Sequence, residues 1–337
     1  QSEISLMYTQ DGKGRRIHHL VLAPSKEVVE QITEALLKKG RVDYDGRPIF
    51  GMSSIEFVEM LRNISDKIEV IPAHCMTPWF GVFGSKSGFN SLKDCFKEKE
   101  KYIHAVETGM SADPPMLWRF SHLEGKNLVS FSDIHSFWPW RLGREATLFD
   151  TDIDYGQILN AIRTGNKLNG TLEVPPSYGK YHYDGHRLCN VVLHPDETKK
   201  HNGICPACKN KLTIGVAYRV EELADRHEGY KQSNSKKFSS VVPLTELIAA
   251  AYGIKQLSSK KTWEVYNKLL NSFGSEFNIL LNADKDKIAK VVDIKLAELI
   301  MRNRTNEIKI KPGYDGVYGE LVVTDKIENK NKTLVDF

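Results

Sequence analysis

The sequence predicts an α/β protein with a mainly parallel sheet, followed by a small zinc-binding module and a mainly helical C-terminal domain. Up to about residue 165, short apolar runs alternate with longer amphipathic runs, which is the pattern of successive βαβ units. A group of histidines and cysteines follows, and beyond residue 240 the apolar residues recur with helical spacing. The predicted domains are residues 1–165, 180–215 and 240–337.

Strands and helices are expected to alternate in the first domain. The strands are expected over residues 4–8, 17–23, 68–74, 102–109 and 127–135. Amphipathic spacing predicts helices over residues 26–40, 53–67, 88–102 and 154–165. The second of these helices opens with a capping box, because Ser53 is followed three positions later by Glu56. The alternation predicts a sheet that is either open or closed into a barrel.

The segments after residue 165 are predicted to form a linker, a loop, a hairpin and helices. Residues 166–180 are rich in Gly, Pro and Asn and are expected to form a linker, whereas residues 226–240 are polar and basic and are expected to form a flexible or substrate-facing loop. Turn signals between two alternating runs predict a hairpin over 307–323. The C-terminal helices are expected over residues 242–254, 260–274 and 284–304.

Composition restricts the class of protein. The 337 residues are 41% hydrophobic and 27% charged, which is an ordinary globular composition. No apolar stretch approaches the roughly 18 residues that a membrane span requires, so no membrane partner is expected. The net charge of +4 is compatible with an anionic partner but does not require one. Five cysteines, three of them clustered, favour a metal site in a reduced, cytoplasmic compartment over a disulfide framework.

Metal-binding side chains stand at the ends of three successive predicted strands. His74, Glu107 and the pair Asp133 and His135 each fall at or near such an end. Residues two apart on a strand share a face, so Asp133 and His135 would point the same way. Because sites in parallel α/β folds are built at the carboxyl ends of strands, this edge is predicted to carry a metal or acid–base site. The alternative is a surface aspartate beside structural histidines.

Further candidates lie on the first two predicted strands. His18 and His19 are adjacent and would point to opposite faces, so only one of them can join the cluster. Glu3 stands at the head of the first strand. Imidazoles mixed with carboxylates suit Zn²⁺, Mn²⁺ or Fe²⁺ better than Ca²⁺. Several such ligands indicate two or more cations, which is an arrangement that serves phosphoryl transfer.

A second constellation has the spacing of a structural zinc site. The motif reads H-x₂-C, then fifteen residues, then C-x₂-C, and two chelating pairs at that separation predict a closed tetrahedral site. The predicted ligands are His186, Cys189, Cys205 and Cys208. His182 and His201 are rivals for the histidine position, and the alternative is free thiols in a core. Closed sites hold a module together and perform no chemistry.

Aromatic and basic residues near the predicted site are weaker candidates for DNA contacts. The loop after the third strand would stack a base and hold a phosphate, or else form a hydrophobic lid. The arginines of the segment WPWRLGREA would bind phosphate or make surface salt bridges. The tyrosine of the predicted hairpin would contact DNA or have only a structural role in the turn. The candidates are Trp79, Phe80, Lys86, Arg141, Arg144 and Tyr314.

The chain resembles the endonuclease Q family in long motifs spread over nearly its whole length. These motifs are IPAHCMTPWFGVFGSKSGF, AVETGMSADPPMLWR, SDIHSFWPWRLGREA, KYHYDGHRLCN and LTIGVAYRVEELADR. The resemblance implies the PHP (polymerase and histidinol phosphatase) fold, a distorted β/α barrel with a cluster of metals at one mouth. It also implies a metal-dependent DNA repair nuclease that nicks the strand 5′ to a deaminated base (uracil, hypoxanthine or xanthine) or to an abasic site.

The family's residues map onto positions named above. The resemblance implies that Glu107, Asp133 and His135 are catalytic, and that two or three divalent cations (Zn²⁺, Mn²⁺ or Mg²⁺) bind beside a separate structural Zn²⁺. The implied ligands of the catalytic cations are Glu3, His18, His74, Glu107, Asp133 and His135. The implied partner is DNA with a deaminated base, whose damaged nucleotide is expected to be turned out of the duplex.

One departure from the family pattern leaves other interpretations open. The early His-x-His motif of PHP proteins has no counterpart, and the chain begins with Gln1 rather than Met. We therefore expect a piece of a longer protein and a barrel incomplete at its N-terminus, and whether the chain is active without the upstream motif stays open. The alternatives are a PHP-type phosphoesterase of a small phosphomonoester and a catalytically incomplete DNA-binding scaffold. The zinc module and the basic loop count against the phosphoesterase, and the missing motif favours the scaffold.

Overall fold

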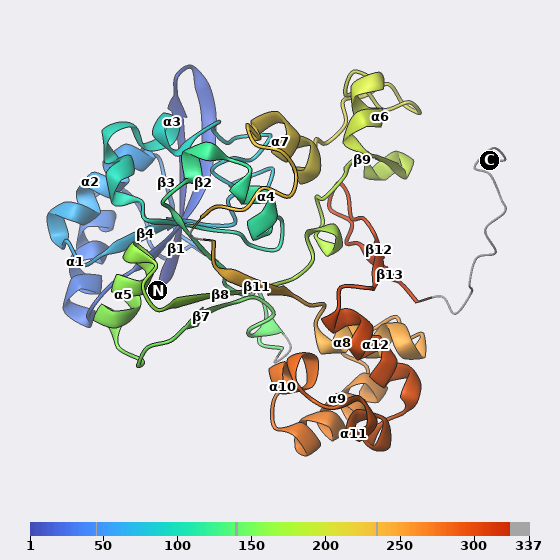
Figure 1. Ribbon diagram of the computed structural model, residues 1–337. Coiled ribbons are helices and arrows are strands. Elements are labelled where there is room, and N and C mark those ends of the chain that lie inside the picture. The colour runs from blue at the N-terminus through green and yellow to red at the C-terminus, as the bar shows by residue number, and fades with distance from the viewer. Residues whose placement is uncertain (45, 139–140, 234, 324–337) are drawn as a thin grey trace. The chain divides into compact units, whose positions relative to one another are not determined.

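The structure, a computed structural model, describes residues 1–44, 46–138, 141–233 and 235–323. It divides into two compact units, which are described separately (Figure 1). The first unit comprises Gln1–Val242 and Pro312–Gly319. The second comprises Pro243–Lys311 and the segment that begins at Glu320. Among the described residues, no helix is both long enough and apolar enough to cross a membrane.

A four-stranded sheet in the order β3-β1-β2-β4 lies at the centre of the first unit. Its strands are β1 (Ser2–Gln10), β2 (Lys13–Leu22), β3 (Ile49–Phe50) and β4 (Glu69–Pro72). β2 runs antiparallel to both β1 and β4, so the prediction of a mainly parallel sheet is wrong here. The reason is the turn between β1 and β2. Asp11 and Gly12 have φ values of 53° and 73°, as a type I′ hairpin requires, and the chain returns beside β1 instead of crossing over.

Helices cover this sheet and close its core. They are α1 (Lys26–Leu37), α2 (Ser54–Ile64), α3 (Leu92–Phe96) and the 3₁₀ helix η1 (Lys97–Tyr102). Phe57 and Leu61 of α2 are fully buried in one cluster with Leu6 and Ile17 of the β1–β2 hairpin. The predicted capping box is confirmed, because Ser53 and Glu56 exchange hydrogen bonds at the start of α2.

The other strands of the first unit form smaller sheets. β5 (Ala105–Glu107) pairs in parallel with β6 (Asn127–Val129). β7 (Ala146–Phe149), β8 (Leu168–Glu173) and β11 (Lys237–Ser240) form a sheet with β8 in the centre. The prediction of a linker over 166–180 is therefore wrong for β8. The glycine at position 170 suggested a flexible connection. Instead, Gly170 (φ 151°) allows the backbone of Lys237 to approach β8 closely.

Shorter elements complete the first unit. Around the β5–β6 pair lie α4 (Pro114–Trp118), the 3₁₀ helix η2 (Ser121–Leu123) and α5 (Tyr155–Thr164). The cysteine-rich region contains the 3₁₀ helices η4 (Pro176–Tyr178) and η5 (Arg187–Cys189), the hairpin of β9 (Asp184–His186) and β10 (Val191–Leu193), and the helices α6 (Pro195–Lys200) and α7 (Val216–Leu223). β9 and β10 pair antiparallel.

The second unit is helical, with one antiparallel strand pair. Its elements are α8 (Leu244–Tyr252), α9 (Lys260–Phe273), α10 (Glu276–Leu281), α11 (Lys285–Val291), α12 (Ile294–Arg304), β12 (Lys309–Lys311) and β13 (Glu320–Val322). The pairing of β12 with β13 confirms the predicted strands of the C-terminal hairpin. The single helix predicted over 284–304 is instead two helices. The first ends at Val291, and Asp293 caps the second, because its side chain accepts a hydrogen bond from the N–H of Leu296 (2.9 Å).

Replacing Asp293 with alanine is expected to destabilise α12 by about 2 to 3 kcal/mol. The substitution removes the N-cap and also the 2.6 Å hydrogen bond from the Tyr252 hydroxyl to the Asp293 carboxylate. Asp284→Ala is the matched control, because Asp284 caps α11 in the same way, and its loss should cost about 1 kcal/mol. Hydrogen exchange of the α12 and α11 amides measures both effects. Equal effects of the two substitutions would contradict a role for the tyrosine hydrogen bond.

Candidate active site

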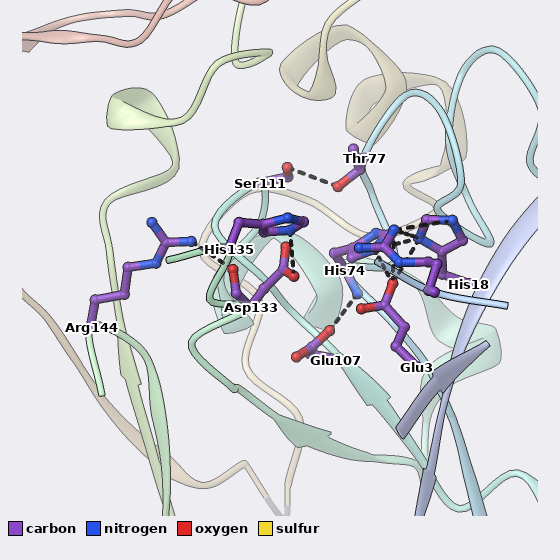
Figure 2. Close-up of polar contacts among 10 residues, drawn as sticks. Glu3, His18, His74, Thr77, Glu107, Ser111, Asp133, His135 and Arg144 are labelled. Atoms are coloured by element: carbon purple, nitrogen blue, oxygen red, sulfur yellow. Dashed lines mark hydrogen bonds and ion pairs between the residues drawn. The ribbon is translucent and has the colours of Figure 1, made fainter. Parts of the chain in front are cut away.

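One carboxylate and two imidazoles converge on the open face of the β1–β2 hairpin (Figure 2). The carboxylate oxygen Oε1 of Glu3 lies 2.8 Å from Nδ1 of His18 and 3.3 Å from Nε2 of His74. The two facing ring nitrogens are 3.2 Å apart. Three ligand atoms of types that bind divalent transition metals therefore lie within 4.8 Å of one another. We call Glu3, His18 and His74 the imidazole–carboxylate cluster.

Strand register explains two members of this cluster. His18 lies opposite Ser5 and Glu3 lies opposite Leu20, so His18 and Glu3 are diagonal neighbours on one face of the hairpin. His19 points to the other face. There its ring lies 2.9 Å from the Ser54 hydroxyl and stacks against a core phenylalanine, which settles which of the two adjacent histidines joins the cluster.

Electrostatics inside the cluster favour an ionised carboxylate. Burial opposes ionisation of Glu3, but hydrogen bonds with His18 and His74 outweigh it and hold the pKa of this carboxyl below its ordinary range. Burial also lowers the pKa of His18 to about 4. For His74, the hydrogen bond and charge of Glu3 overcome the effect of burial and raise the pKa of the ring. The anionic Glu3 and the neutral His18 are thus in the forms that ligate a cation, whereas His74 would release its proton when a cation binds.

Glu107 positions His74 by a hydrogen bond to its backbone. It ends β5, is almost fully buried, and its carboxylate accepts a 2.6 Å hydrogen bond from the backbone N–H of His74. Burial raises the pKa of Glu107 to about 7. His74 has a positive φ of 31°, and its backbone passes so close to Gly109 that a Cβ there would lie 2.6 Å from the Cβ of His74. The His74 turn therefore requires glycine at position 109.

Replacing Gly109 with alanine is expected to displace His74 and to weaken divalent-cation binding at the cluster by at least tenfold. Gly125→Ala is a matched control. Gly109 and Gly125 have φ values of 61° and 81°, so alanine strains the backbone at both, but a Cβ at Gly125 would meet no atom within 4 Å. Titration of each variant with Mn²⁺ separates the clash from the strain. If both alanine variants bind Mn²⁺ equally well, the clash with His74 does not control the site.

Asp133 and His135 occupy an irregular loop, not the predicted strand. The strand expected over 127–135 ends with β6 at Val129, and Asp133 has a positive φ of 40°. The prediction that Asp133 and His135 share one face of a strand is therefore wrong. The two side chains still meet, because Nε2 of His135 lies 3.1 Å from Oδ1 of Asp133. Arg144 holds the loop by donating hydrogen bonds to the carbonyls of Ser132 (2.9 Å) and Asp133 (3.1 Å).

An open cavity joins these groups. Glu3, Glu107 and Asp133 all line it, and Figure 2 shows the Asp133–His135 pair across the same space from the imidazole–carboxylate cluster. The six predicted metal ligands thus surround one region of the first unit. His135 lies at its exposed edge, with a side chain that is 67% exposed.

Two residues of this region carry no signal in the sequence. Nη1 of Arg47 lies 2.8 Å from Nδ1 of His18 and 3.3 Å from Oε1 of Glu3, although Arg47 belongs to the loop between α1 and β3. Glu145 lines the cavity from the segment before β7, and burial raises the pKa of its carboxyl well above the ordinary value. A lone arginine in a polar loop and a glutamate beside a strand are both common, so only the folded chain reveals their positions.

The four predicted zinc ligands also come together. Nδ1 of His186 lies 3.2 Å from both the Cys189 and the Cys208 sulfur, and one ligand atom from each of the four residues lies within 4.8 Å of the others. Backbone N–H groups of Cys208 and Ala207 lower the pKa of the Cys205 thiol to about 6, which favours the thiolate form that binds metal. One imidazole and three thiols are a donor set of structural Zn²⁺ sites. The rivals His182 and His201 do not belong to the group.

The predicted DNA-binding residues are dispersed over the first unit. The Phe80 ring stacks on His18 (4.3 Å between centroids), so it walls the cluster. Trp79 packs edge-on against Tyr181, and Lys86 lies above the Trp79 ring. Tyr314 packs so closely on Gly185 of β9 that a Cβ at position 185 would clash with it. Arg141 lies in a half-buried turn, and the Arg144 guanidinium faces the Asp133 loop.

Comparison with known sequences finds related proteins of unassigned function. The family described as the MJ0043 C-terminal domain matches residues 243–307. Protein MJ0043 of Methanocaldococcus jannaschii is 33% identical over 299 residues, which cover 85% of this chain and 35% of MJ0043. Protein YqxK of Bacillus subtilis is 28% identical over 314 residues, which cover 90% of this chain and 73% of YqxK. The chain thus spans about a third of the length of MJ0043.

Two solved structures match nearly the whole chain. The lesion-specific endonuclease PfuEndoQ of Pyrococcus furiosus superimposes with a TM-score of 0.82 at 29% identity, over 98% of this chain and 79% of that chain. The chain is a structural relative of endonuclease Q. The resemblance predicted from the motifs is therefore confirmed. Endonuclease Q in complex with a 27-mer duplex that carries an abasic lesion at its active site matches with a TM-score of 0.84 at 29% identity, over 98% of this chain and 82% of that one.

Proposed function

We propose that this chain carries the active site of a metal-dependent DNA repair endonuclease, which nicks the phosphodiester on the 5′ side of a damaged nucleotide. The observation that carries the proposal is the convergence of Glu3, His18 and His74. The fold around that cluster matches a lesion-specific endonuclease over 98% of this chain. The two facts support each other, because such a donor set binds divalent cations and such cations serve phosphodiester hydrolysis.

The donor atoms around the cavity fit divalent cations. Glu145 lines the cavity, and one of its carboxylate oxygens is buried without a hydrogen-bond partner, which is costly unless another group satisfies it. We assign two or three cations (Zn²⁺, Mn²⁺ or Mg²⁺) to this region. Such cations supply an activated water molecule and neutralise charge on the transferring phosphate. The residues that would hold them are Glu3, His18, His74, Glu107, Asp133 and His135.

The protein's own groups have distinct roles in the proposal. Glu107 fixes the backbone of His74 through its hydrogen bond. The carboxylate of Asp133 orients the ring of His135 at the exposed edge of the cavity. This pair and Glu107 form the proposed catalytic set. At the edge of the cavity the pair can ligate a cation or move a proton during cleavage. Arg144 keeps the pair in place by binding the backbone of its loop.

We also propose a division of the chain into domains and a set of DNA contacts. We assign a structural Zn²⁺ to His186 and the three clustered cysteines, within a zinc-binding module over 180–215. The catalytic domain would cover 1–165, as a PHP-type barrel incomplete at its N-terminus, and a DNA-binding domain would cover 240–337. The proposed DNA contacts are Trp79, Phe80, Lys86, Arg141, Arg144 and Tyr314.

The proposed substrates are abasic sites and deaminated bases. Support for the abasic site comes from the solved endonuclease Q complex, which holds that lesion at its active site. Uracil, hypoxanthine and xanthine follow from the family resemblance. Matched duplexes that carry one lesion each, and an undamaged duplex, test the assignment. Nicks limited to the damaged strands are expected, whereas equal cleavage of the undamaged duplex would contradict lesion specificity.

A parallel assay separates the two rival functions. The chain is incubated with Mn²⁺ and either a lesion duplex or p-nitrophenyl phosphate, with EDTA as control. The repair nuclease nicks the duplex and leaves the monoester intact. A small-molecule phosphoesterase would hydrolyse the monoester only, and a DNA-binding scaffold would bind the duplex in a salt-dependent manner and cleave neither.

A further inference from the structure

The face of the β1–β2 hairpin that carries the imidazole–carboxylate cluster continues toward the turn end of the hairpin. In the antiparallel register His18 lies opposite Ser5, and Arg16 lies opposite Met7. Residues two apart on a strand share a face and stand about 7 Å apart. Arg16 therefore places a guanidinium on the same face as His18, one step closer to the tip that projects from the sheet in Figure 1.

An open furrow runs along this part of the hairpin. Met7, Arg15 and Arg16 of the hairpin line it together with Trp79, Lys86 and Ser87 of the loop after β4. Hydrogen bonds hold this loop against the hairpin. The His18 N–H donates to the Phe80 carbonyl (2.9 Å), and the Ser87 hydroxyl donates to the Arg16 carbonyl (3.1 Å). Because the ring of Phe80 covers His18 and Trp79 is the preceding residue, the furrow begins directly beside the cluster.

The furrow has the chemistry of a nucleic-acid strand site. Arg16 and Lys86 are exposed, and among the described residues neither makes an ion pair with an acidic side chain. Trp79 is held by its edge-on contact with Tyr181, at 5.4 Å between ring centroids, and the Lys86 amine lies 5.9 Å from its ring centre. An aromatic ring beside a lysine, in an opening that an arginine also lines, has the groups needed to stack a base and to bind the adjacent phosphates.

Basic character extends beyond the furrow around the hairpin tip. A neighbouring opening shares Arg15 and Lys86 and adds Lys13 and Arg219. Asp11 and Asp94 also line it, so positive charge is in excess without being exclusive.

We propose that this furrow binds the DNA strand next to the scissile phosphate. Arg16 and Lys86 hold phosphates of that strand, and Trp79 stacks on one of its bases. The inference rests on the proposed nuclease function. It adds to that function the path that the cleaved DNA strand follows away from the cluster. The inference depends on the position of Arg16, which shares a face of the hairpin with His18. A DNA strand whose cleaved phosphate lies at the cluster would reach Arg16 two residues further along β2.

Binding without cleavage tests the furrow. A fluorescent duplex with one abasic site is titrated with the full chain in EDTA at several salt concentrations. Arg16→Ala and Lys86→Ala are each expected to weaken binding by about three- to tenfold and to reduce the slope of log K against log salt by about one. Lys26→Ala is the matched control, because Lys26 is an exposed lysine on α1, and it should leave affinity and slope unchanged.

Trp79 provides a second, independent readout. Trp79→Leu is expected to weaken binding of the same duplex, and Trp79→Phe is expected to restore it, because phenylalanine keeps a ring for stacking. Wild-type affinity and salt slope in both the Arg16→Ala and the Lys86→Ala variants would overturn the inference, even if the chain nicks DNA. Reduced slopes in a chain that does not nick DNA would leave the inference standing and overturn the proposed function instead.

Discussion

Glu3→Gln is expected to reduce lesion-dependent nicking by about a thousandfold, equivalent to about 4 kcal/mol of transition-state stabilisation. Glutamine keeps the size of the side chain but removes the negative charge that lies 2.8 Å from His18 and 3.3 Å from His74. A neutral amide is a poor ligand for a divalent cation. The affinity of the chain for Mn²⁺, measured by calorimetry, should therefore fall together with the nicking rate, while DNA binding in EDTA stays unchanged.

Glu34→Gln is the matched control for this substitution. Glu34 is an exposed glutamate of α1, so its loss changes the net charge equally without touching the cavity. Wild-type nicking by Glu34→Gln together with the expected loss in Glu3→Gln assigns the effect to the cluster. Wild-type Mn²⁺ affinity and nicking in Glu3→Gln would exclude Glu3 as a ligand.

Cys205→Ser is expected to release the structural zinc and to unfold the β9–β10 hairpin around it. The four ligand atoms lie within 4.8 Å of one another, and zinc binding contributes on the order of 10 kcal/mol to folding in small modules of this kind. Serine is a much weaker zinc ligand than a thiolate. Zinc content by elemental analysis should fall to background, and amides of β9 and β10 should lose protection from hydrogen exchange.

The rival ligand supplies the control for the zinc prediction. His201 ends α6 and is exposed, outside the group of four, so His201→Ala should retain zinc and exchange protection. Zinc loss in His201→Ala, or its retention in Cys205→Ser, would show that the ligand set is different from the one assigned.

Much of the site could be predicted from the sequence because ligand types cluster at element ends. His74 follows β4 and Glu107 ends β5, as the apolar runs indicated. The contact between Asp133 and His135 was predicted from strand alternation, but the two residues lie in an irregular loop. Their contact depends on the positive φ of Asp133 and on Arg144. Spacing along the chain predicts which residues are near in sequence, but loop conformation decides which of them meet.

The fold was harder to predict where short turns and glycines set the chain direction. The Asp11-Gly12 turn makes β1 and β2 a hairpin, although the apolar runs alone are equally compatible with parallel strands. Gly170 and the asparagine-rich composition around it conceal the central strand β8. Arg47 reaches the cluster from a loop, and no periodicity or motif marks such a residue. The pairing of β8 and the position of Arg47 depend on tertiary contacts, which a local pattern does not record, whereas the Asp11-Gly12 turn is a local signal that the apolar runs alone do not show.

The most direct test of the central claim uses duplex DNA with a single deoxyuridine, incubated with this chain and Mn²⁺. The products are sized on a denaturing gel, with EDTA and undamaged duplex as controls. The account predicts one chelator-sensitive nick immediately 5′ to the uracil, which leaves a 3′-hydroxyl and a 5′-phosphate, and no nick in the Glu3→Gln variant. A nick that persists in EDTA, or no nick from a chain that binds both Mn²⁺ and the duplex, would contradict it.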